Sequence, residues 1–248
     1  MSDVIYADDA LIGVAKAAGE PVIPLGAGPR DACLHRRLEA QRGERLWVVH
    51  RIDREASGVV VFARNPHAHR ALSLAFEHRM VEKTYLAFAA GALAPPAGCF
   101  DAPLHAARKG RTRPAEAEEA GSREAVTDYL VRRRWRLGDR VVSLVELAPH
   151  QGRHHQLRVH LRSAGAPILF DPIYGRAIPR EVMAGAPCAR LALHALRLVL
   201  PQFGPPELQA RAEVRPGERL VIEAPIAADL TALGEWLDAV WRVEPVTS

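Results

Sequence analysis

The stretch LWVVHRIDREASGVVVFARN, residues 46–65, sets a dense group of charged side chains between two apolar runs. Residues 46–49 and 59–63 are apolar and rich in valine, which predicts two strands. Asp53 lies between them, two residues after Arg51. A carboxylate in a short surface connection can face a cleft, and neighbouring arginines favour its ionised form. Asp53 is therefore a candidate nucleophile or base, although an aspartate that only hydrogen-bonds turn amides is an alternative.

The composition is typical of a globular chain with a substantial core. Its 248 residues are 48% hydrophobic and 25% charged, which is enough for one large domain or two small ones. No repeat or long low-complexity linker divides the sequence, so we predict a single domain over residues 1–248. The three cysteines are widely separated and odd in number, which indicates neither a disulfide framework nor a paired-cysteine zinc site.

Signals for export or membrane insertion are missing from the sequence. The opening residues, MSDVIYADDALIGVAK, lack a basic region followed by a continuous apolar run. No stretch approaches the roughly 20 apolar residues that span a bilayer. We therefore expect a monomeric, cytoplasmic protein without a membrane partner.

The charge distribution favours a polyanionic partner. The net charge is only +4, but basic residues gather in HAARKGRTRP, residues 105–114, and in RRRWR, residues 132–136. Such clusters can neutralise backbone phosphates and make binding depend on salt. A solvated loop and a solvated strand end are the alternative interpretation of the same two clusters.

The remaining pattern predicts strands mixed irregularly with a few helices. Asn65 followed by Pro66 indicates a helix start. A second helix is expected from about Arg153 to a C-terminal cap at Gly165, and a third near residues 229–241. Further strands are predicted at residues 84–90, 125–131, 141–147, 191–200 and 220–222. This irregular order predicts an α+β fold rather than a doubly wound parallel sheet.

The helix expected from Arg153 has a polar and an apolar face. Spacings of three and four residues place side chains on one face, which groups His154, His155, Arg158 and Arg162. Leu157, Leu161 and Ala164 form the face that we expect to be buried. The histidines suggest zinc, but the ligand spacing with its intervening glutamate is missing, so no metal site is predicted. The polar face suits a phosphate or a carboxylate such as that of Asp53.

The segment VEKTYLAFAAG places Lys83 and Tyr85 on one face of a predicted strand, because they are two residues apart. A cation and a phenol directed into one cleft can hold a phosphate and stack on a base. A half-buried tyrosine beside a lysine that extends to solvent is the more ordinary alternative.

Together and in this order, these segments resemble the RluA family of RNA pseudouridine synthases. The matches are HRIDREASG at residues 50–58, EKTYLAFAAG at 82–91 and GRHHQLRVHLRSAGAPILFDPIYG at 152–175, with weaker ones near both ends. The chain departs from the family at Ala56, where Thr is usual, at Ala15-Lys16-Ala17, where Asn-Lys-Pro is usual, and at Phe170, where Gly is preferred. The resemblance implies the pseudouridine synthase catalytic fold, a mixed and mainly antiparallel sheet flanked by helices. No room precedes Val4 for an accessory N-terminal RNA-binding domain, so we expect the catalytic domain to hold RNA alone.

The resemblance also implies the reaction. A uridine in RNA has its N1–C1′ bond broken, the uracil rotates, and a C5–C1′ bond forms without cofactor or metal. Asp53 would be the essential catalytic group, Tyr85 would lie against the flipped uracil, and Arg158 would pair with Asp53 through its planar fork. Arg51 is the candidate to fill the space that the flipped base vacates. The other expected RNA-binding residues are Lys83, Arg153, His155 and Gln156.

Several alternatives stay open at this level. A non-catalytic RNA-binding or assembly protein could use the same scaffold, although such a protein is expected to have lost Asp53, Tyr85 or Arg158, and all three are present. A glycosidase that releases free base is a second alternative. Neither the target, ribosomal or transfer RNA, nor the step that Asp53 performs follows from the sequence: it could attack C1′, attack the base, or remove a sugar proton.

Overall fold

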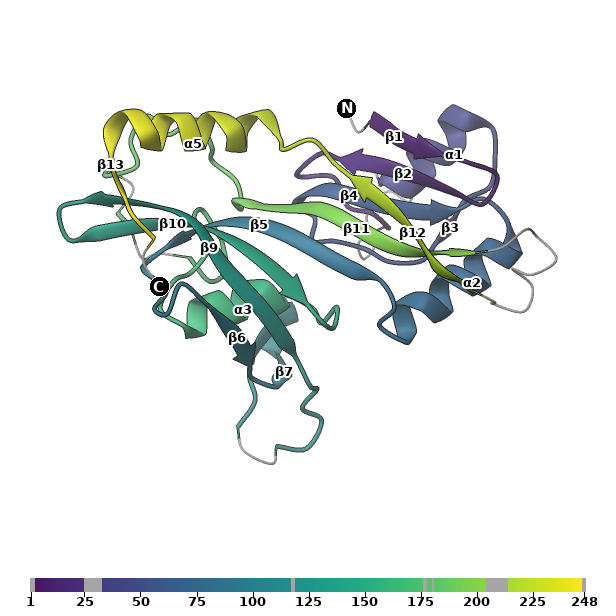
Figure 1. Ribbon diagram of the computed structural model, residues 1–248, viewed down its shortest axis with the longest axis horizontal. Helices are drawn as coiled ribbons and strands as arrows, with labels where there is room; N and C mark the ends of the chain where they lie inside the picture. Colours follow the sequence, from purple (N-terminus) through teal and green to yellow (C-terminus); the bar gives the residue numbers. More distant parts are fainter. Residues whose placement is uncertain are drawn as a thin grey trace. The chain divides into compact units, whose positions relative to one another are not determined.

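The computed structural model describes residues 3–24, 33–116, 119–175, 178–179, 181–203 and 214–246 (Figure 1). The chain divides into two compact units. Unit 1 comprises Met1–Lys83 and Ala195–Pro225, and unit 2 comprises Thr84–His194 and Ile226–Ser248. Within the described residues, none of the helices has both the length and the apolar character needed to cross a membrane.

Unit 1 is built around a fully buried strand, β4 (Ser57–Ala63), which pairs antiparallel with β2 (Leu11–Lys16) and β3 (Trp47–Val48). The remaining elements of the unit are β1 (Asp3–Ala7), β11 (Leu193–Phe203, of which residues 195–203 belong here), β12 (Val214–Glu223), α1 (Leu34–Arg42) and α2 (Pro66–Glu77). The strand order is β1-β2-β4-β11, with β3 on β4 and β12 on β11. Valines fill β4 because β-branched side chains pack well in a strand covered on both faces.

Among its described residues, unit 2 contains a group of antiparallel strands, a small hairpin and two α-helices. Its elements are β5 (Glu82–Ala90, of which residues 84–90 belong here), β6 (Ala97–Asp101), β7 (Leu104–Ala107), η1 (Arg108–Gly110), β8 (Arg111–Pro114), β9 (Val126–Leu137), β10 (Arg140–Pro149), α3 (Gln156–Ser163), α5 (Ala228–Val240) and β13 (Arg242–Glu244). The strand order is β5-β10-β9-β13, with β6 on β9, and β7 pairs with β8 alone. Phe88 stacks on Trp135 with ring centroids 5.8 Å apart, and the Trp135 indole donates to Asp238 of α5 at 2.7 Å.

The described elements confirm the α+β prediction and most of the predicted strands. Each strand predicted from residue 59 onward lies within or largely overlaps an observed strand. Asn65 caps α2, because its side chain accepts a hydrogen bond from the Ala68 N–H at 2.8 Å. Gly165 has φ +75 and follows α3 as predicted, with the Ala166 N–H bonded to the Leu161 carbonyl at 2.9 Å.

The predicted start and faces of α3 were partly wrong. The helix begins at Gln156 rather than near Arg153, because His155 has a left-handed backbone conformation with φ 55 that a helix cannot continue. His154 and His155 therefore precede the helix and do not share a helical face with Arg158. Ala164 is exposed, whereas Arg158 is buried beside Leu157 and Leu161. Tertiary contacts at the first turn override the regular spacing on which the prediction depended.

Phe170 occupies a backbone conformation that explains the family's preference for glycine at this position. Its φ is 59, a left-handed conformation that costs a non-glycine residue about 1–2 kcal/mol. We expect Phe170→Gly to leave the free energy of unfolding unchanged or to raise it by up to about 1 kcal/mol, because relief of backbone strain offsets the lost contacts and the greater entropy of unfolded glycine. Denaturant unfolding measures this change.

Leu169→Gly is the matched control for Phe170→Gly. Leu169 is a buried neighbour that has no positive φ, so its replacement by glycine relieves no strain and should lose more than about 2 kcal/mol. If Phe170→Gly lowers the free energy of unfolding as much as this control does, the left-handed conformation of Phe170 does not strain the chain.

Candidate active site

His50 fixes the first end of the loop that carries Asp53. Its Nε2 accepts a hydrogen bond from the Val61 N–H of β4 at 2.9 Å, and its ring stacks on Phe76 of α2 with centroids 4.6 Å apart. Burial of the imidazole, followed by the positive charge of Lys83, lowers the pKa of His50 to about 3. His50 is therefore neutral at physiological pH, as its acceptor role at Val61 requires.

This low pKa predicts a dependence of stability on pH. Because the folded pKa lies below the ordinary value of 6.5, the unfolded state binds a proton more readily than the folded state. The free energy of unfolding should therefore fall as pH drops below about 6.5, and continue to fall towards pH 3. Urea unfolding at several pH values measures the slope. His50→Gln keeps an acceptor for Val61 without a titrating group, so it should flatten the slope, and an unchanged slope would contradict the assignment.

Lys16 fixes the other end of this loop. Its side chain is buried, and its ammonium donates hydrogen bonds to the carbonyl oxygens of Ala17 at 2.8 Å, Glu20 at 2.8 Å and Arg54 at 3.0 Å. The Arg54 carbonyl also accepts the Gly19 N–H at 2.8 Å. The segment that lacks the usual family proline is thus tied to the residue directly after Asp53 by a buried cation.

Between these fixed ends, the loop leaves Asp53 accessible. Arg51 is exposed, Ile52 is buried, and Asp53 is half-buried. Gly58, in the strand that follows, has φ +120, and its hypothetical Cβ would lie 2.1 Å from the backbone oxygen of Ala195. Only glycine fits there. The loop can therefore present a carboxylate to a substrate while its backbone is held in place.

Arg158 and Asp171 form a buried bidentate ion pair in unit 2. Arg158 donates from Nε to Oδ2 and from Nη2 to Oδ1 of Asp171, both at 2.8 Å. The two side chains are 1% and 0% exposed. The Oδ1 atom also accepts the backbone N–H groups of Ile173 and Tyr174. Burial alone would raise the pKa of Asp171, but the bonds and charge of Arg158 and these two N–H groups hold that pKa below its usual value.

The geometry of this pair orients the rest of the guanidinium. Asp171 engages the edge formed by Nε and Nη2, and the Tyr174 ring lies 5.3 Å from the guanidinium carbon. A second carboxylate would therefore have to approach Arg158 from the edge formed by Nη1 and the remaining N–H of Nη2. The predicted partner, Asp53, belongs to unit 1, and its pairing with Arg158 stays a prediction.

Two of the predicted residues lie on β5. Lys83 and Tyr85 are both half-buried and alternate along the strand, so they share a face. Tyr85 pairs with Leu147 of β10 in the sheet register.

The remaining predicted residues surround the first turn of α3. Arg153 donates from Nε to the Glu124 carbonyl at 3.0 Å, and the His155 ring nitrogen Nδ1 lies 3.0 Å from the Tyr174 hydroxyl. The Gln156 side chain is buried, accepts the Arg153 N–H and donates to β9. The contacts of Gln156 favour support of the turn, and a direct contact with substrate stays a prediction for all three residues.

Sequence reasoning missed Asp171, Lys16 and His50 as positioning residues. Each lies inside or beside one of the family motifs. For Asp171, the sequence prediction overlooked a second partner of Arg158. It assigned one carboxylate, Asp53, to this arginine, although a guanidinium can bind a carboxylate on each of two edges. An acidic residue in the same motif, such as Asp171, was a detectable candidate for the second edge.

Comparison with known proteins agrees with the motifs. Residues 10–163 match the model of the RNA pseudouridylate synthase family. The ribosomal large subunit pseudouridine synthase D of Xanthomonas campestris pv. campestris is 39% identical over 71% of this chain and 52% of its own length. The tRNA pseudouridine synthase C of Pasteurella multocida is 34% identical over 79% of this chain and 84% of its own. The dual-specificity RNA pseudouridine synthase RluA of Vibrio vulnificus is 31% identical over 79% of this chain and 76% of its own length.

The chain thus spans about half the length of the first of these relatives and most of the other two. Two solved human structures share the fold. RNA pseudouridylate synthase domain containing 1 has a TM-score of 0.74 and 22% identity, covering 100% of this chain and 91% of that one. RNA pseudouridylate synthase domain containing 4 has a TM-score of 0.71 and 24% identity, covering 98% of this chain and 94% of that one. The match to the family model and the identity to relatives of similar length lead to one conclusion: this chain belongs to the RluA family of RNA pseudouridine synthases.

Proposed function

We propose that this protein converts uridine to pseudouridine in structured ribosomal or transfer RNA. The observation that carries the proposal is the loop from His50 to Arg54, which is held at both ends and presents a half-buried carboxylate at Asp53. The relatives named above act, by their names, on ribosomal RNA, on tRNA or on both kinds. Family membership and the intact Asp53, Tyr85 and Arg158 favour an enzyme over a non-catalytic RNA-binding protein.

Each proposed role follows from the chemistry of the residue. Asp53 acts at the sugar or the base when the N1–C1′ bond breaks, since developing positive charge or a covalent adduct there needs a carboxylate. Arg158, held by Asp171, pairs with Asp53 and orients it. Tyr85 lies against the extruded uracil and assists removal of the C5 proton, while Arg51 fills the space left in the RNA stack. The reaction is an isomerisation, so the atoms balance without a co-reactant.

The remaining parts of the proposal concern the protein as a whole. We infer that both units act as one catalytic domain, because the family match at residues 10–163 includes parts of each. Lys83, Arg153 and His155 contribute to RNA binding. The protein is proposed to act in the cytoplasm as a monomer.

Mass measurement combined with pseudouridine mapping tests the function. Ribosomal and transfer RNA from cells with and without this protein are mapped, and purified protein is added to the unmodified RNA. Pseudouridine at specific positions with unchanged RNA mass supports the proposal and identifies the target. Loss of base mass would indicate a glycosidase instead, and RNA binding without either change would indicate the non-catalytic alternative.

A further inference from the structure

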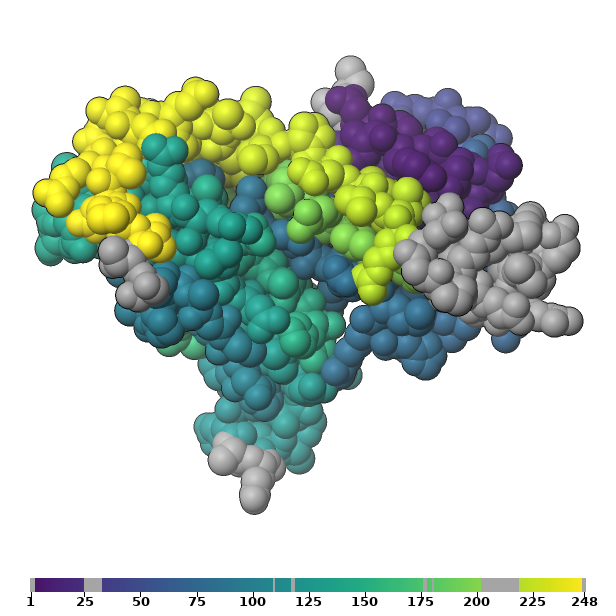
Figure 2. Space-filling view, in the orientation of Figure 1, coloured from purple at the N-terminus to yellow at the C-terminus, as the bar shows by residue number. Residues whose placement is uncertain are grey.

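The hairpin β7–β8 and helix α3 line an open pocket of about 300 Å³ within unit 2. Its described lining consists of Ala107, Arg111, Thr112, Arg113, Pro114, Val159, Arg162, Ser163, Ile173 and Tyr174. The teal hairpin region lies towards the lower end of unit 2 in the space-filling view, where its surface is visible (Figure 2). A pocket of this size is at the lower end of those that hold small ligands or parts of larger ones, roughly 300–1,000 Å³.

The pocket carries uncompensated positive charge. Three arginines line it, and none of the described lining residues is acidic. Arg113 is neutralised, because its Nη1 donates to Glu119 at 2.8 Å. Arg162 donates from Nη1 to the Tyr174 carbonyl at 2.9 Å, which fixes its side chain without neutralising it. The Arg111 side chain has no hydrogen-bond or ion-pair partner among the described residues, so two cations remain for a ligand.

Hydrogen bonds between buried residues hold the floor of the pocket in place. Thr112 and Tyr174 are 7% exposed, and the Thr112 N–H donates to the Tyr174 hydroxyl at 2.8 Å. The Thr112 hydroxyl lies 3.1 Å from His154 Nδ1. The same Tyr174 ring covers the guanidinium of Arg158. The hairpin is thus connected through Tyr174 to Arg158, the proposed catalytic arginine, which places the pocket beside this residue.

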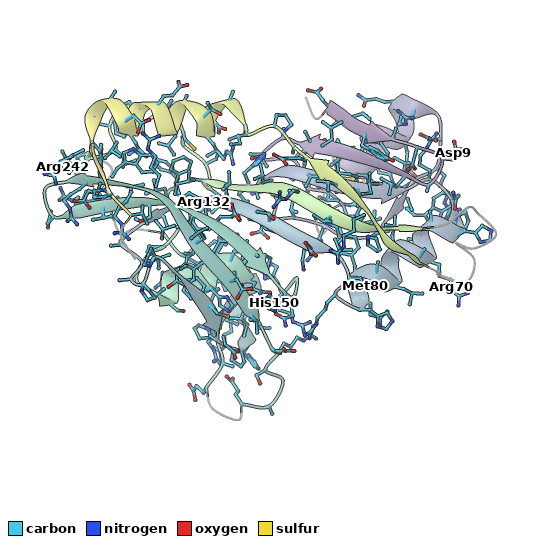
Figure 3. The ribbon with its side chains drawn as sticks, viewed as in Figure 1. Asp9, Arg70, Met80, Arg132, His150 and Arg242 are labelled. Atoms are coloured by element: carbon cyan, nitrogen blue, oxygen red, sulfur yellow. The ribbon has the colours of Figure 1, made fainter. Side chains whose placement is uncertain are left out.

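The second basic cluster, residues 132–136, differs from the pocket. Arg132 pairs with Glu146 at 2.7 Å, Arg133 with Asp238 at 2.7 Å, and Arg136 with Glu244. These arginines lie towards the β13 end of β9, whereas β6 and the hairpin adjoin its first residues. In Figure 3, Arg132 and Arg242 lie away from His150, which directly follows β10 and bonds through its N–H to the Val126 carbonyl at the start of β9. The paired arginines favour the strand-end interpretation that the sequence left open.

We propose that the pocket binds one phosphodiester group of the substrate RNA, a proposal that rests on the proposed function. Arginine donates in a planar fork that matches phosphate oxygens, and Arg111 and Arg162 supply two such groups on opposite elements, β8 and α3. The held position of Arg162 reduces the entropy lost on binding. The pocket therefore fixes the RNA strand against the hairpin at a defined place beside Arg158, rather than attracting it by general charge.

A charge-matched pair of double variants tests the proposal. Arg111→Ala with Arg162→Ala removes two charges from the pocket, and Arg132→Ala with Arg133→Ala removes two exposed charges from the other end of β9. RNA affinity is measured as a function of salt. The pocket variant should bind RNA about tenfold more weakly and lower the slope of log affinity against log salt by about 1–2. The control should change affinity less than about threefold, because its arginines are already paired.

The remaining outcomes separate the possible failures. If both double variants lose the same RNA affinity, or if the pocket variant loses none, the proposal that the pocket binds RNA is wrong. If inorganic phosphate alone raises the melting temperature of the parent but not of the pocket variant, while RNA affinity is equal, the pocket takes free phosphate and the RNA assignment is wrong. Arg111→Gln, at an exposed position, repeats the test if the double variant does not fold. If the parent protein binds RNA but forms no pseudouridine, the proposed function is wrong, whereas the comparison of RNA affinities still tests the pocket.

Discussion

Asp53→Asn is expected to abolish pseudouridine formation while leaving RNA affinity and thermal stability nearly intact. Asparagine keeps the shape and hydrogen bonding of the side chain but supplies no negative charge at the reacting sugar or base. Because Asp53 is half-buried in a loop held by Lys16 and His50, its replacement should not displace the backbone. We expect a loss of at least about 10³-fold in turnover, equivalent to roughly 4 kcal/mol in the barrier.

Single-turnover assays with saturating RNA measure this loss, and a filter-binding assay measures affinity on the same preparation. Asp139→Asn is the matched control, since Asp139 is an exposed aspartate in the turn between β9 and β10. It removes the same charge and should keep full activity. Turnover of Asp53→Asn within about tenfold of the parent, a difference of only ~1.4 kcal/mol, would rule out Asp53 as the essential group.

The loop that carries Asp53 was predictable from the sequence for local reasons. The valine run of β4 and the Asn65-Pro66 helix start are both signals that act over a few residues. Local signals of this kind define where strands and helices lie. They also place a charged loop between the strands, and for this reason the amino-acid sequence alone is enough to select Asp53 as a candidate.

The surroundings of Arg158 were not predictable in the same way. The start of α3 depends on Gln156, whose side chain bonds to Val126 and Thr127 of β9, far away in the sequence. The pairing of Arg133 depends on Asp238 near the C-terminal end of the chain. Periodicity carries no information about such partners. Periodicity therefore selects Arg158 as a candidate but predicts too few of its contacts.

Removing Asp171's charge is expected to have the second large effect. Asp171→Asn keeps an acceptor for the N–H groups of Ile173 and Tyr174 but leaves Arg158 buried without this counter-charge. Breaking a buried pair by removing one partner typically destabilises a protein by about 3–5 kcal/mol. Turnover should also fall, because the guanidinium loses the bond that fixes its orientation, whereas RNA affinity should change little. Denaturant unfolding and single-turnover kinetics measure the two effects separately.

Arg190→Ala provides a control in the same unit. Arg190 also makes a two-point ion pair, with Asp229, but the two side chains are 18% and 35% exposed. A pair that is partly solvated contributes less, about 1 kcal/mol or below, and Arg190 has no proposed part in the reaction. If Asp171→Asn is no more damaging than this control, burial does not make the Arg158–Asp171 pair important.

Variants of Arg158 itself then test whether the arginine acts on Asp53 or only on RNA. Arg158→Ala should remove most activity and leave Asp171 unpaired, and adding Asp171→Asn should recover part of the lost stability because it removes the isolated buried charge. Arg158→Lys restores the charge without the planar guanidinium. Since Asp171 uses two donors of the guanidinium, lysine should recover only part of the activity.

Combining Asp53→Asn with Arg158→Ala should reduce turnover little below that of Asp53→Asn alone, because the effects of groups that act as one unit are not additive. If Arg158→Ala instead keeps full turnover and loses only RNA affinity, the arginine contacts phosphate and does not orient Asp53.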